Sequence, residues 1–240
     1  SSGTSLSFVK DVLTGQAATS YDALFAEAGE APFGANGLVF VPTLGGGTSL
    51  EGGPDIRGAL IGLDLGHTRA DIARATIEGI ALGLRVALDE LRKLTSVSET
   101  MTIVGGGARH PLMRQVMADI LSCRIVKTSV DQQSASLGAA TLAMVALGIW
   151  PGVSAVMQAH GGAEEHAPDK GRGERVAAMV AAYRASAAAQ AALAPLLAPL
   201  RRQMRLASQS SCARSWKEPP PSWSLKPYSR IAFSAPACAL

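Results

Sequence analysis

Three consecutive glycines, Gly105, Gly106 and Gly107, give this sequence its clearest sign of chemistry. An apolar stretch, 101–104, precedes them and predicts a buried strand, and Pro111 opens a segment whose apolar residues have helical spacing. Glycine lets the backbone approach a ligand without an intervening Cβ. The first amides of a helix lack intrahelical partners and can donate to polar or anionic atoms. The spacing therefore predicts a ligand-binding turn between a strand and a helix, and a turn that binds nothing is the alternative.

The glycine turn matches neither of two common nucleotide-binding fingerprints. The pattern Gly-x-Gly-x-x-Gly fails because position 110 is His, and a Walker A loop fails because no Gly-Lys-Ser/Thr follows. The glycines alone thus indicate a place for a ligand without naming its class.

Few side chains near the recognisable motifs are suited to proton transfer or metal binding. Thr68 and Asp71 have the spacing of a capping box, with Asp in place of Glu, which gives Asp71 a structural role. Asp64 has no neighbour in the sequence suited to support a general base, and His67 and His160 are isolated. The cysteines and histidines show no metal-ligand spacing. We predict no catalytic and no metal-ligating residue in this chain.

Alternating helical and strand patterns surround these residues. The clearest helix is predicted over 69–94, and Gly83 within it is expected to permit close packing. The other patterns predict strands at 37–41, 59–63, 101–104 and 124–128, and helices at 1–13, 21–28, 111–121, 134–147 and 174–200. This alternation indicates an α/β layer fold with an Ala-rich helix near its end.

The end of the chain differs in composition from the rest. Residues 151–172 are expected to form a loop-rich connection, and 203–240 combine prolines, serines and basic residues without a helical or strand period. We predict a folded domain over 1–202 and a disordered tail over 203–240, of the kind that out-of-frame translation would give. A basic, proline-rich recognition tail is the alternative.

Composition excludes several classes of function. The formal net charge is +3, but five basic residues and one acidic residue lie in 203–240, so that 1–202 is close to neutral and offers no basis for binding nucleic acid. The 3 scattered cysteines favour a reducing compartment. The apolar stretch 176–200 contains prolines and polar residues, which favours a surface helix over a membrane span, and no signal peptide is visible. We expect a cytoplasmic protein without a membrane partner.

Five stretches, in order and at matching intervals, resemble the C-terminal domain of the FGGY carbohydrate kinases, and within that family the xylulose kinase branch. The two longest are Gly-Ala-Asn-Gly-Leu-Val-Phe-Val-Pro (34–42) and Ile-Arg-Gly-Ala-Leu-Ile-Gly-Leu-Asp-Leu-Gly-His-Thr-Arg-Ala-Asp-Ile-Ala-Arg-Ala (56–75). The others are Ile-Glu-Gly-Ile-Ala (77–81), Val-Gly-Gly-Gly-Ala-Arg (104–109) and Ser-Leu-Gly-Ala-Ala (136–140). Weaker likeness extends from residue 1 to about residue 202.

The resemblance implies a ribonuclease H-like, actin-like ATPase domain that binds ATP with Mg²⁺. In that family ATP lies between two domains and the sugar lies mainly against the N-terminal one. The turn formed by Gly105, Gly106, Gly107 and Ala108 would bind adenosine, and Arg109 and His110 would flank the adenine. The start of the chain resembles the segment with which glycerol kinases contact nucleotide through a glycine and a glutamine. Gly3 matches that glycine, whereas Ser7 stands in place of the glutamine.

The sequence also departs from the family pattern. The xylulose kinase branch usually has Gly-Glu-Arg-Thr-Pro where this chain has Gly-Gly-Gly-Thr-Ser at 45–49, which leaves the sugar open. A flexible loop at the edge of the cleft is the alternative explanation of these glycines. The catalytic Asp, the phosphate-binding hairpins and most sugar contacts of the family belong to an N-terminal domain that precedes the matching region.

These observations favour the ATP-binding part of a sugar kinase that is inactive alone. It would bind ATP or ADP, and it would bind a sugar or polyol only together with the N-terminal domain. The alternatives are a non-catalytic partner subunit of a split kinase, a truncated relic, and a generic α/β nucleotide-binding domain. Apolar surface left without the partner domain would favour aggregation or a homodimer.

Overall fold

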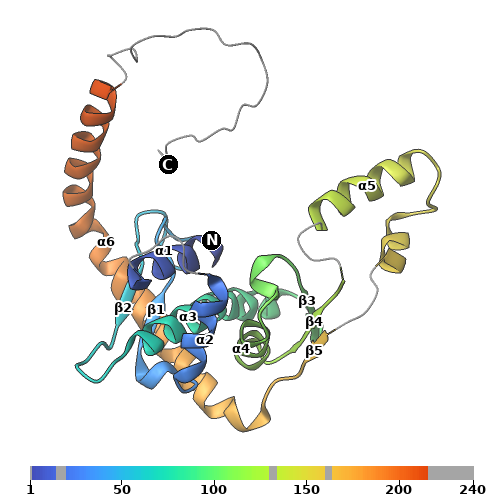
Figure 1. Cartoon of the computed structure of the whole chain (residues 1–240), viewed down its shortest axis with the longest axis horizontal. Coiled ribbons are helices and arrows are strands. Elements are labelled where there is room, and N and C mark those ends of the chain that lie inside the picture. Colours follow the sequence, from blue (N-terminus) through green and yellow to red (C-terminus); the bar gives the residue numbers. More distant parts are fainter. Residues whose placement is uncertain (1, 15–19, 130–133, 160–163, 216–240) are drawn as a thin grey trace. The chain divides into compact units, whose positions relative to one another are not determined.

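The computed structural model describes residues 2–14, 20–129, 134–159 and 164–215 (Figure 1). The chain divides into two compact units, Ser1–Leu196 and Leu197–Leu240. All the features below belong to the first unit, unless the end of the last helix is named.

Helix α3 (Arg69–Leu94) is the centre of the core, and it contacts α1 (Ser2–Thr14), α2 (Tyr21–Glu30) and α4 (Pro111–Leu121). The predicted capping box is confirmed, because the Thr68 hydroxyl accepts from the Asp71 amide while the Asp71 carboxylate accepts from the Thr68 amide at 2.8 Å. Apolar side chains of α3 such as Ile77 are fully buried, and such burial stabilises the fold by about 1.5–3 kcal/mol for each large side chain.

Two glycines of α3 allow close approach. A Cβ at Gly79 would collide with the carbonyl oxygen of Phe40, and one at Gly83 would lie 3.0 Å from the hydroxyl of Tyr183. The expected packing role of Gly83 is confirmed.

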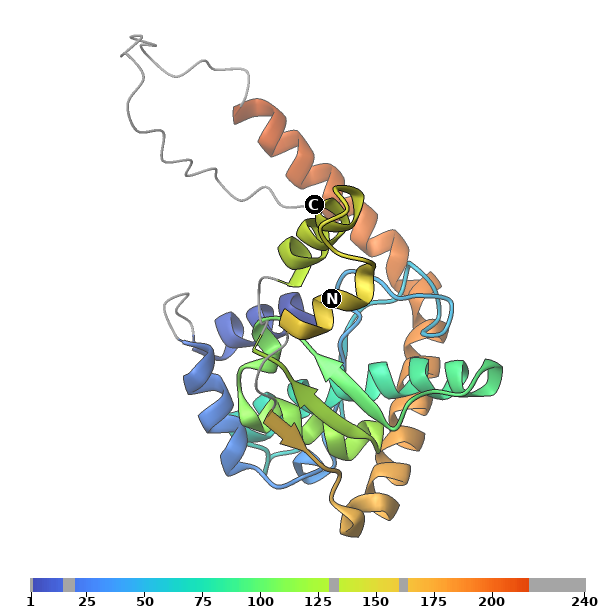
Figure 2. The ribbon, with the colours of Figure 1, turned by 90° about the vertical axis from the view of Figure 1, so that its right-hand side faces the viewer.

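Three strands form one sheet beside α4, and Figure 2 shows them as neighbouring arrows. They are β3 (Thr100–Ile103), β4 (Arg124–Lys127) and β5 (Glu164–His166), in the order β3-β4-β5. β3 and β4 are parallel and are joined through α4, whereas β5 is antiparallel to β4. The strand predicted before the glycines is present, but the prediction that it is buried is wrong. Thr100 and Thr102, alternate residues of β3, are exposed.

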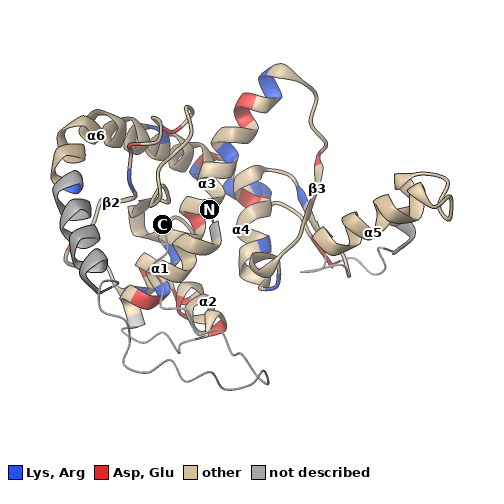
Figure 3. Ribbon diagram, turned by 90° about the horizontal axis from the view of Figure 1, so that it is seen from above, with Lys and Arg blue, Asp and Glu red and all other residues tan. Residues whose placement is uncertain are grey.

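The remaining elements agree with the predicted pattern within a few residues. β1 (Val39–Val41) and β2 (Ala59–Ile61) form an antiparallel pair. Helix α5 (Ser134–Ala146) carries no charged residue, as Figure 3 shows, and it contacts the turn η3 (Val153–Ala159). The other short 3₁₀ turns are η1 (Ala35–Gly37), η2 (Gly106–Ala108) and η4 (Lys170–Arg172).

The last helix extends beyond the predicted domain boundary. Helix α6 (Gly173–Ser215) continues through 203–215, where the sequence analysis expected an irregular tail. Leucine, methionine, glutamine and arginine in this segment all have good helix propensity, which explains the difference. The rest of the predicted tail, 216–240, lies outside the described residues.

One segment, Lys170–Arg201, is long and apolar enough to cross a membrane by length and composition. Within it Val176, Tyr183 and Ala194 are buried, but only 22% of its most apolar window is buried. Of the three cysteines, Cys123 is a free thiol in the core.

Candidate functional site

A cavity of about 640 Å³ lies where the glycine turn meets the first two helices. The N-terminal ends of α1 and α2 form one side of the cavity, and the turn after β3 forms the other. The residues that line it are Gly3, Leu6, Ser20, Tyr21, Asp22, Phe25, Gly106, Gly107, Arg109 and His110. The fold thus brings Gly3 together with the glycine turn, although about a hundred residues separate them in the sequence.

The glycine turn leaves β3 through a conformation that side chains rarely adopt. Gly105 has φ 92° and ψ 179°, and η2 follows it as one tight turn before α4. A Cβ at Gly105 would meet nothing within 4 Å, and one at Gly107 would only touch the Met113 methyl group at 3.8 Å. Added Cβ atoms at Gly105 and Gly107 would therefore meet no clash.

Two of the predicted site residues do not line the cavity. The Ala108 side chain is buried in the core, and Gly105 stands before the part of the turn that faces the cavity. Gly105 and Ala108 shape the turn through their backbone, because the Gly105 carbonyl accepts from the Ala108 amide at 3.0 Å. Gly3, Gly106, Gly107, Arg109 and His110 are brought together as the resemblance implies.

His110 is fixed by two contacts. Its Nδ1 accepts from the Leu112 amide at 3.2 Å and caps α4, and its ring stacks on Phe25 at 4.4 Å between centroids with an angle of 6° between planes. Burial is the main cause that lowers the pKa of His110, and Arg114 adds to it while Asp22 opposes it. A neutral ring with the proton on Nε2 therefore faces the cavity.

The start of α2 supplies cavity residues that the sequence analysis missed. The Ser20 hydroxyl caps α2 by accepting from the Ala23 amide at 3.2 Å, and Asp22 lies in the first helical turn. The capping pattern could have located this helix start, but nothing in it shows that the helix start faces residues 106–110. Asp22 brings a carboxylate into the cavity.

The other polar residues considered from the sequence have structural roles or lie elsewhere. The Asp64 amide donates to His67 Nδ1 at 3.0 Å, and neither residue lines the cavity. Asp71 serves the capping box and also accepts from the Asn36 side chain at 2.8 Å. His160 lies outside the described residues, and within the described part of the chain no three His, Cys, Asp or Glu side chains gather as a metal site would need.

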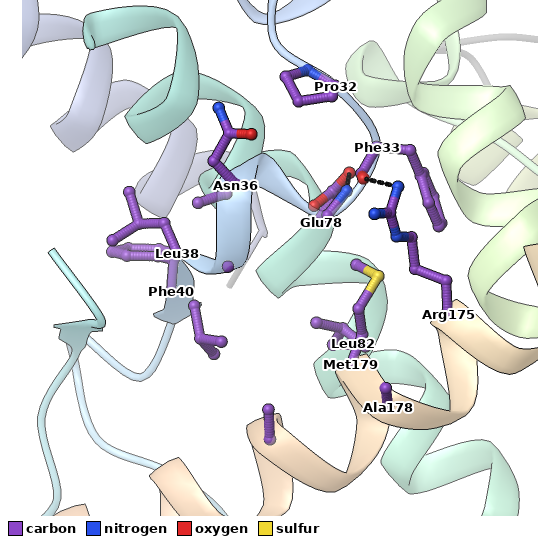
Figure 4. Close-up of a pocket in the computed structure, with 15 residues that line it drawn as sticks. Pro32, Phe33, Asn36, Leu38, Phe40, Glu78, Leu82, Arg175, Ala178 and Met179 are labelled. Carbon is purple, nitrogen blue, oxygen red and sulfur yellow. Dashed lines mark hydrogen bonds between the residues drawn. The ribbon is translucent and has the colours of Figure 1, made fainter. Parts of the chain in front are cut away.

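A second cavity, of about 360 Å³, lies between the loop before β1, α3 and the first turns of α6 (Figure 4). Its walls are mostly apolar, and Asn36, Glu78 and Arg175 bring polar side chains to it. Glu78 accepts from Arg74 Nε at 2.6 Å and from the Gly34 amide at 3.0 Å. Burial raises the pKa of the Glu78 carboxyl, and Arg74 opposes that rise. Glu78 therefore fixes the backbone at Gly34, where φ is 91°, and no residue of the predicted site lies here.

Comparison with known proteins assigns the family. Residues 5–147, more than half of the chain, match the FGGY family of carbohydrate kinases, C-terminal domain. The chain therefore belongs to this family, and the resemblance seen in the sequence is confirmed. It is 36% identical over 140 residues to a xylulose kinase of Staphylococcus epidermidis, covering 58% of this chain and 28% of that protein.

Solved structures agree with this assignment. A gluconate kinase from Lactobacillus acidophilus superposes with a TM-score of 0.67 at 29% identity, covering 80% of this chain and 38% of that one. A glycerol kinase from Plasmodium falciparum, solved with ADP, has a TM-score of 0.60 at 22% identity over 74% of this chain and 35% of that one, which supports the fold alone. The fold is the α/β actin-like ATPase fold, and the chain spans well under half the length of these relatives.

Proposed function

We propose that the cavity beside the glycine turn binds the adenosine part of ATP or ADP, and that this chain is the nucleotide-binding part of an ATP-dependent sugar kinase. The observation that carries the proposal is the meeting of Gly3 with Gly106 and Gly107 at one cavity, in a member of a carbohydrate kinase family. A glycerol kinase of the same fold was solved with ADP, which is consistent with this class of ligand.

The chemistry of the cavity suits a nucleoside. Its volume of about 640 Å³ lies within the usual range for small-molecule sites. Glycine at 106 and 107 lets backbone amides approach a ligand, and Asp22 and Ser20 offer hydrogen-bonding groups for ribose hydroxyls or an exocyclic amine. Arg109 and His110 would flank the adenine.

We infer that the sugar and the reacting groups depend on residues outside this chain. Phosphoryl transfer needs a base for the attacking hydroxyl and charge stabilisation around the γ-phosphate, with Mg²⁺ bound largely through the nucleotide. Among the described residues lining the cavity, Asp22 is the one carboxylate, and no cluster beside it could hold a metal. The relatives are named for xylulose, gluconate and glycerol, so the sugar itself stays open. We expect the protein to act in the cytoplasm.

Calorimetric titration of the full chain with ADP and with MgATP tests the nucleotide site. Gly107→Trp should abolish the heat of binding, because Gly107 lines the cavity and the bulk of an indole would displace the turn or occupy the space that a ligand needs. Gly29→Trp is the matched control, since Gly29 is exposed on α2, has open space around it and does not line the cavity. Equal binding by both variants, or no binding by the folded parent chain, would overturn the proposal.

A coupled kinase assay tests the inactivity of the chain alone. Xylulose, gluconate and glycerol should each give no ADP release above the background of MgATP hydrolysis. Turnover of any of them at enzymatic rates would show that the chain carries its own base.

A further inference from the structure

A buried arginine lies directly behind the glycine turn. The Arg114 side chain is 4% exposed, and its Nη1 donates to the carbonyl oxygens of Ala108 and Arg109, both at 2.6 Å. These two carbonyls lie at the end of η2 and directly precede His110. One guanidinium group therefore fixes the backbone at the point where the turn passes from Gly107 to the cap of α4.

Two residues of β5, Glu164 and His166, accept hydrogen bonds from the same guanidinium. Arg114 Nη2 donates to Glu164 Oε2 at 2.5 Å, and Nε donates to His166 Nε2 at 3.1 Å. Glu164 also receives the Lys127 ammonium at 3.1 Å. A buried charge is tolerated when it is paired and hydrogen-bonded on all sides, and the planar fork of arginine meets these acceptors in directions that an ammonium cannot reproduce.

His166 must be neutral to take part in this arrangement. Its Nε2 accepts from Arg114, and its Nδ1 lies 3.2 Å from Gln115 Oε1, so that the proton belongs on Nδ1. The charged groups that face it are Arg114 and Asp119 of α4 and Glu164 of its own strand. In register, β4 places Ile125 opposite His166 and Lys127 opposite Glu164. Burial is the main cause that lowers the pKa of His166, and Arg114 acts in the same direction while Glu164 and Asp119 oppose it.

We propose that Arg114 is a positioning residue for the nucleotide site, and that neutral His166 keeps it in place, so that acidification loosens the turn and weakens nucleotide binding. This inference rests on the proposed function. Protonated His166 would lose its acceptor nitrogen and place a second positive charge beside Arg114. The guanidinium would then lose the contact that fixes its orientation toward the two carbonyls.

The first test compares Arg114→Lys with Arg124→Lys in the full chain. Arg124 is the matched control, because it is an exposed arginine of the same sheet that pairs with Glu165 at 3.4 Å and does not reach the turn. Arg114→Lys should weaken ADP binding roughly tenfold or more, and Arg124→Lys should leave it unchanged. Hydrogen exchange of the Ala108 and Arg109 amides, which donate to the Gly105 and Gly106 carbonyls, should accelerate by a similar factor in Arg114→Lys alone.

The outcomes separate this inference from the proposed function. One outcome is that the parent chain binds ADP while Arg114→Lys changes neither the affinity nor the exchange rates. That result would overturn the role of Arg114 and leave the nucleotide site standing. Failure of the folded parent to bind ADP would overturn the nucleotide site and the role of Arg114 within it. If Arg114→Lys does not fold, guanidinium ion added to Arg114→Ala gives the same readout, since restored ADP binding supports the inference and no restoration counts against it.

The second test is a pH profile of the parent chain and of His166→Gln. Adenosine is the probe, because it has no phosphate that titrates in this range. Between pH 7.5 and pH 5.5 the parent should lose more affinity than His166→Gln, in which residue 166 cannot be protonated. His110 titrates in both proteins and cancels in the comparison. Parallel profiles would overturn the role of His166.

Discussion

Two glycine-rich segments of this protein use glycine for opposite reasons. In the turn 105–107, an added Cβ would meet open space at Gly105 and an ordinary contact at Gly107. In the loop 45–53, Cβ atoms at three glycines would meet the protein itself: the Pro54 carbonyl oxygen at 2.6 Å from Gly46, Ile56 Cδ1 at 2.6 Å from Gly47, and Ala191 Cβ at 2.5 Å from Gly52, whereas Gly45 and Gly53 have open space. Side chains would fit at Gly105 and Gly107 without a clash, whereas neighbouring atoms already occupy the space beside Gly46, Gly47 and Gly52.

This difference bears on the interpretation of glycine runs. A flexible loop at the edge of the cleft was the alternative explanation for 45–49. In the structure the Gly47 amide donates to the Gly53 carbonyl at 3.1 Å, and the Thr48 amide donates to the Glu51 carboxylate at 3.0 Å, which fix this loop. A run of glycines is therefore compatible with ligand binding only where neighbouring atoms do not already fill the space beside the glycines.

The largest effect is expected at the packed loop. Gly46 has φ 110°, and Gly46→Ala combines backbone strain with a clash against Pro54, so it should lower the free energy of unfolding by about 2–4 kcal/mol. Urea unfolding followed by circular dichroism measures this. A loss below that of Gly107→Ala would mean that the loop is not packed as described.

A smaller loss of stability is expected at the start of the binding turn. Gly105→Ala meets no neighbour, but its φ of 92° and ψ of 179° belong to a region that is almost restricted to glycine, which costs about 1–3 kcal/mol. The same variant should weaken ADP binding, because relief of the strain would move the turn. Unchanged unfolding and unchanged affinity together would contradict the strained geometry.

The turn also differs from the loop in its response to pH. His110 caps α4 only while Nδ1 is unprotonated, and its pKa is lowered by burial. Below about pH 6.5, His110 binds a proton more readily in the unfolded chain than in the folded chain. The free energy of unfolding should therefore fall as the pH drops below this value, by roughly 1 kcal/mol for the lost cap. Urea unfolding at pH 7.5 and pH 5.5 measures the loss, and His110→Asn, which caps without titrating, should show less of it.

The smallest effect is expected at Gly107. Gly107→Ala places a Cβ in ordinary contact with Met113 at a position without positive φ, so the unfolding free energy should change by less than about 1 kcal/mol. Together with the loss of binding expected for Gly107→Trp, this would show that the residue is needed for ligand space and not for folding. A large destabilisation by Ala would place Gly107 with the packed glycines.

The sequence predicted most elements well where local signals are strong. Thr68 and Asp71 marked the start of α3, and Pro111 marked that of α4, because caps and helix-initiating proline act within one turn. The order of strands and helices and the position of the glycine turn also followed from local patterns.

Features that depend on distant contacts could not be predicted in the same way. β5 was missed because Glu-Glu-His has no apolar alternation, and its strand exists through pairing with β4. Asp22 and Phe25 were missed as cavity residues because their place depends on how α2 packs. Arg114 looked like one more polar residue of a helix, and its burial depends on partners 50 and 52 residues further along the chain.

The late position of β5 has a consequence for synthesis. The glycine turn and α4 leave the ribosome well before Glu164 and His166 exist, so the nascent chain has the turn without the contacts that hold Arg114. Closing so long a connection is slow compared with forming α4. With the proposed nucleotide site, a newly made chain would thus bind nucleotide more weakly until β5 has paired with β4.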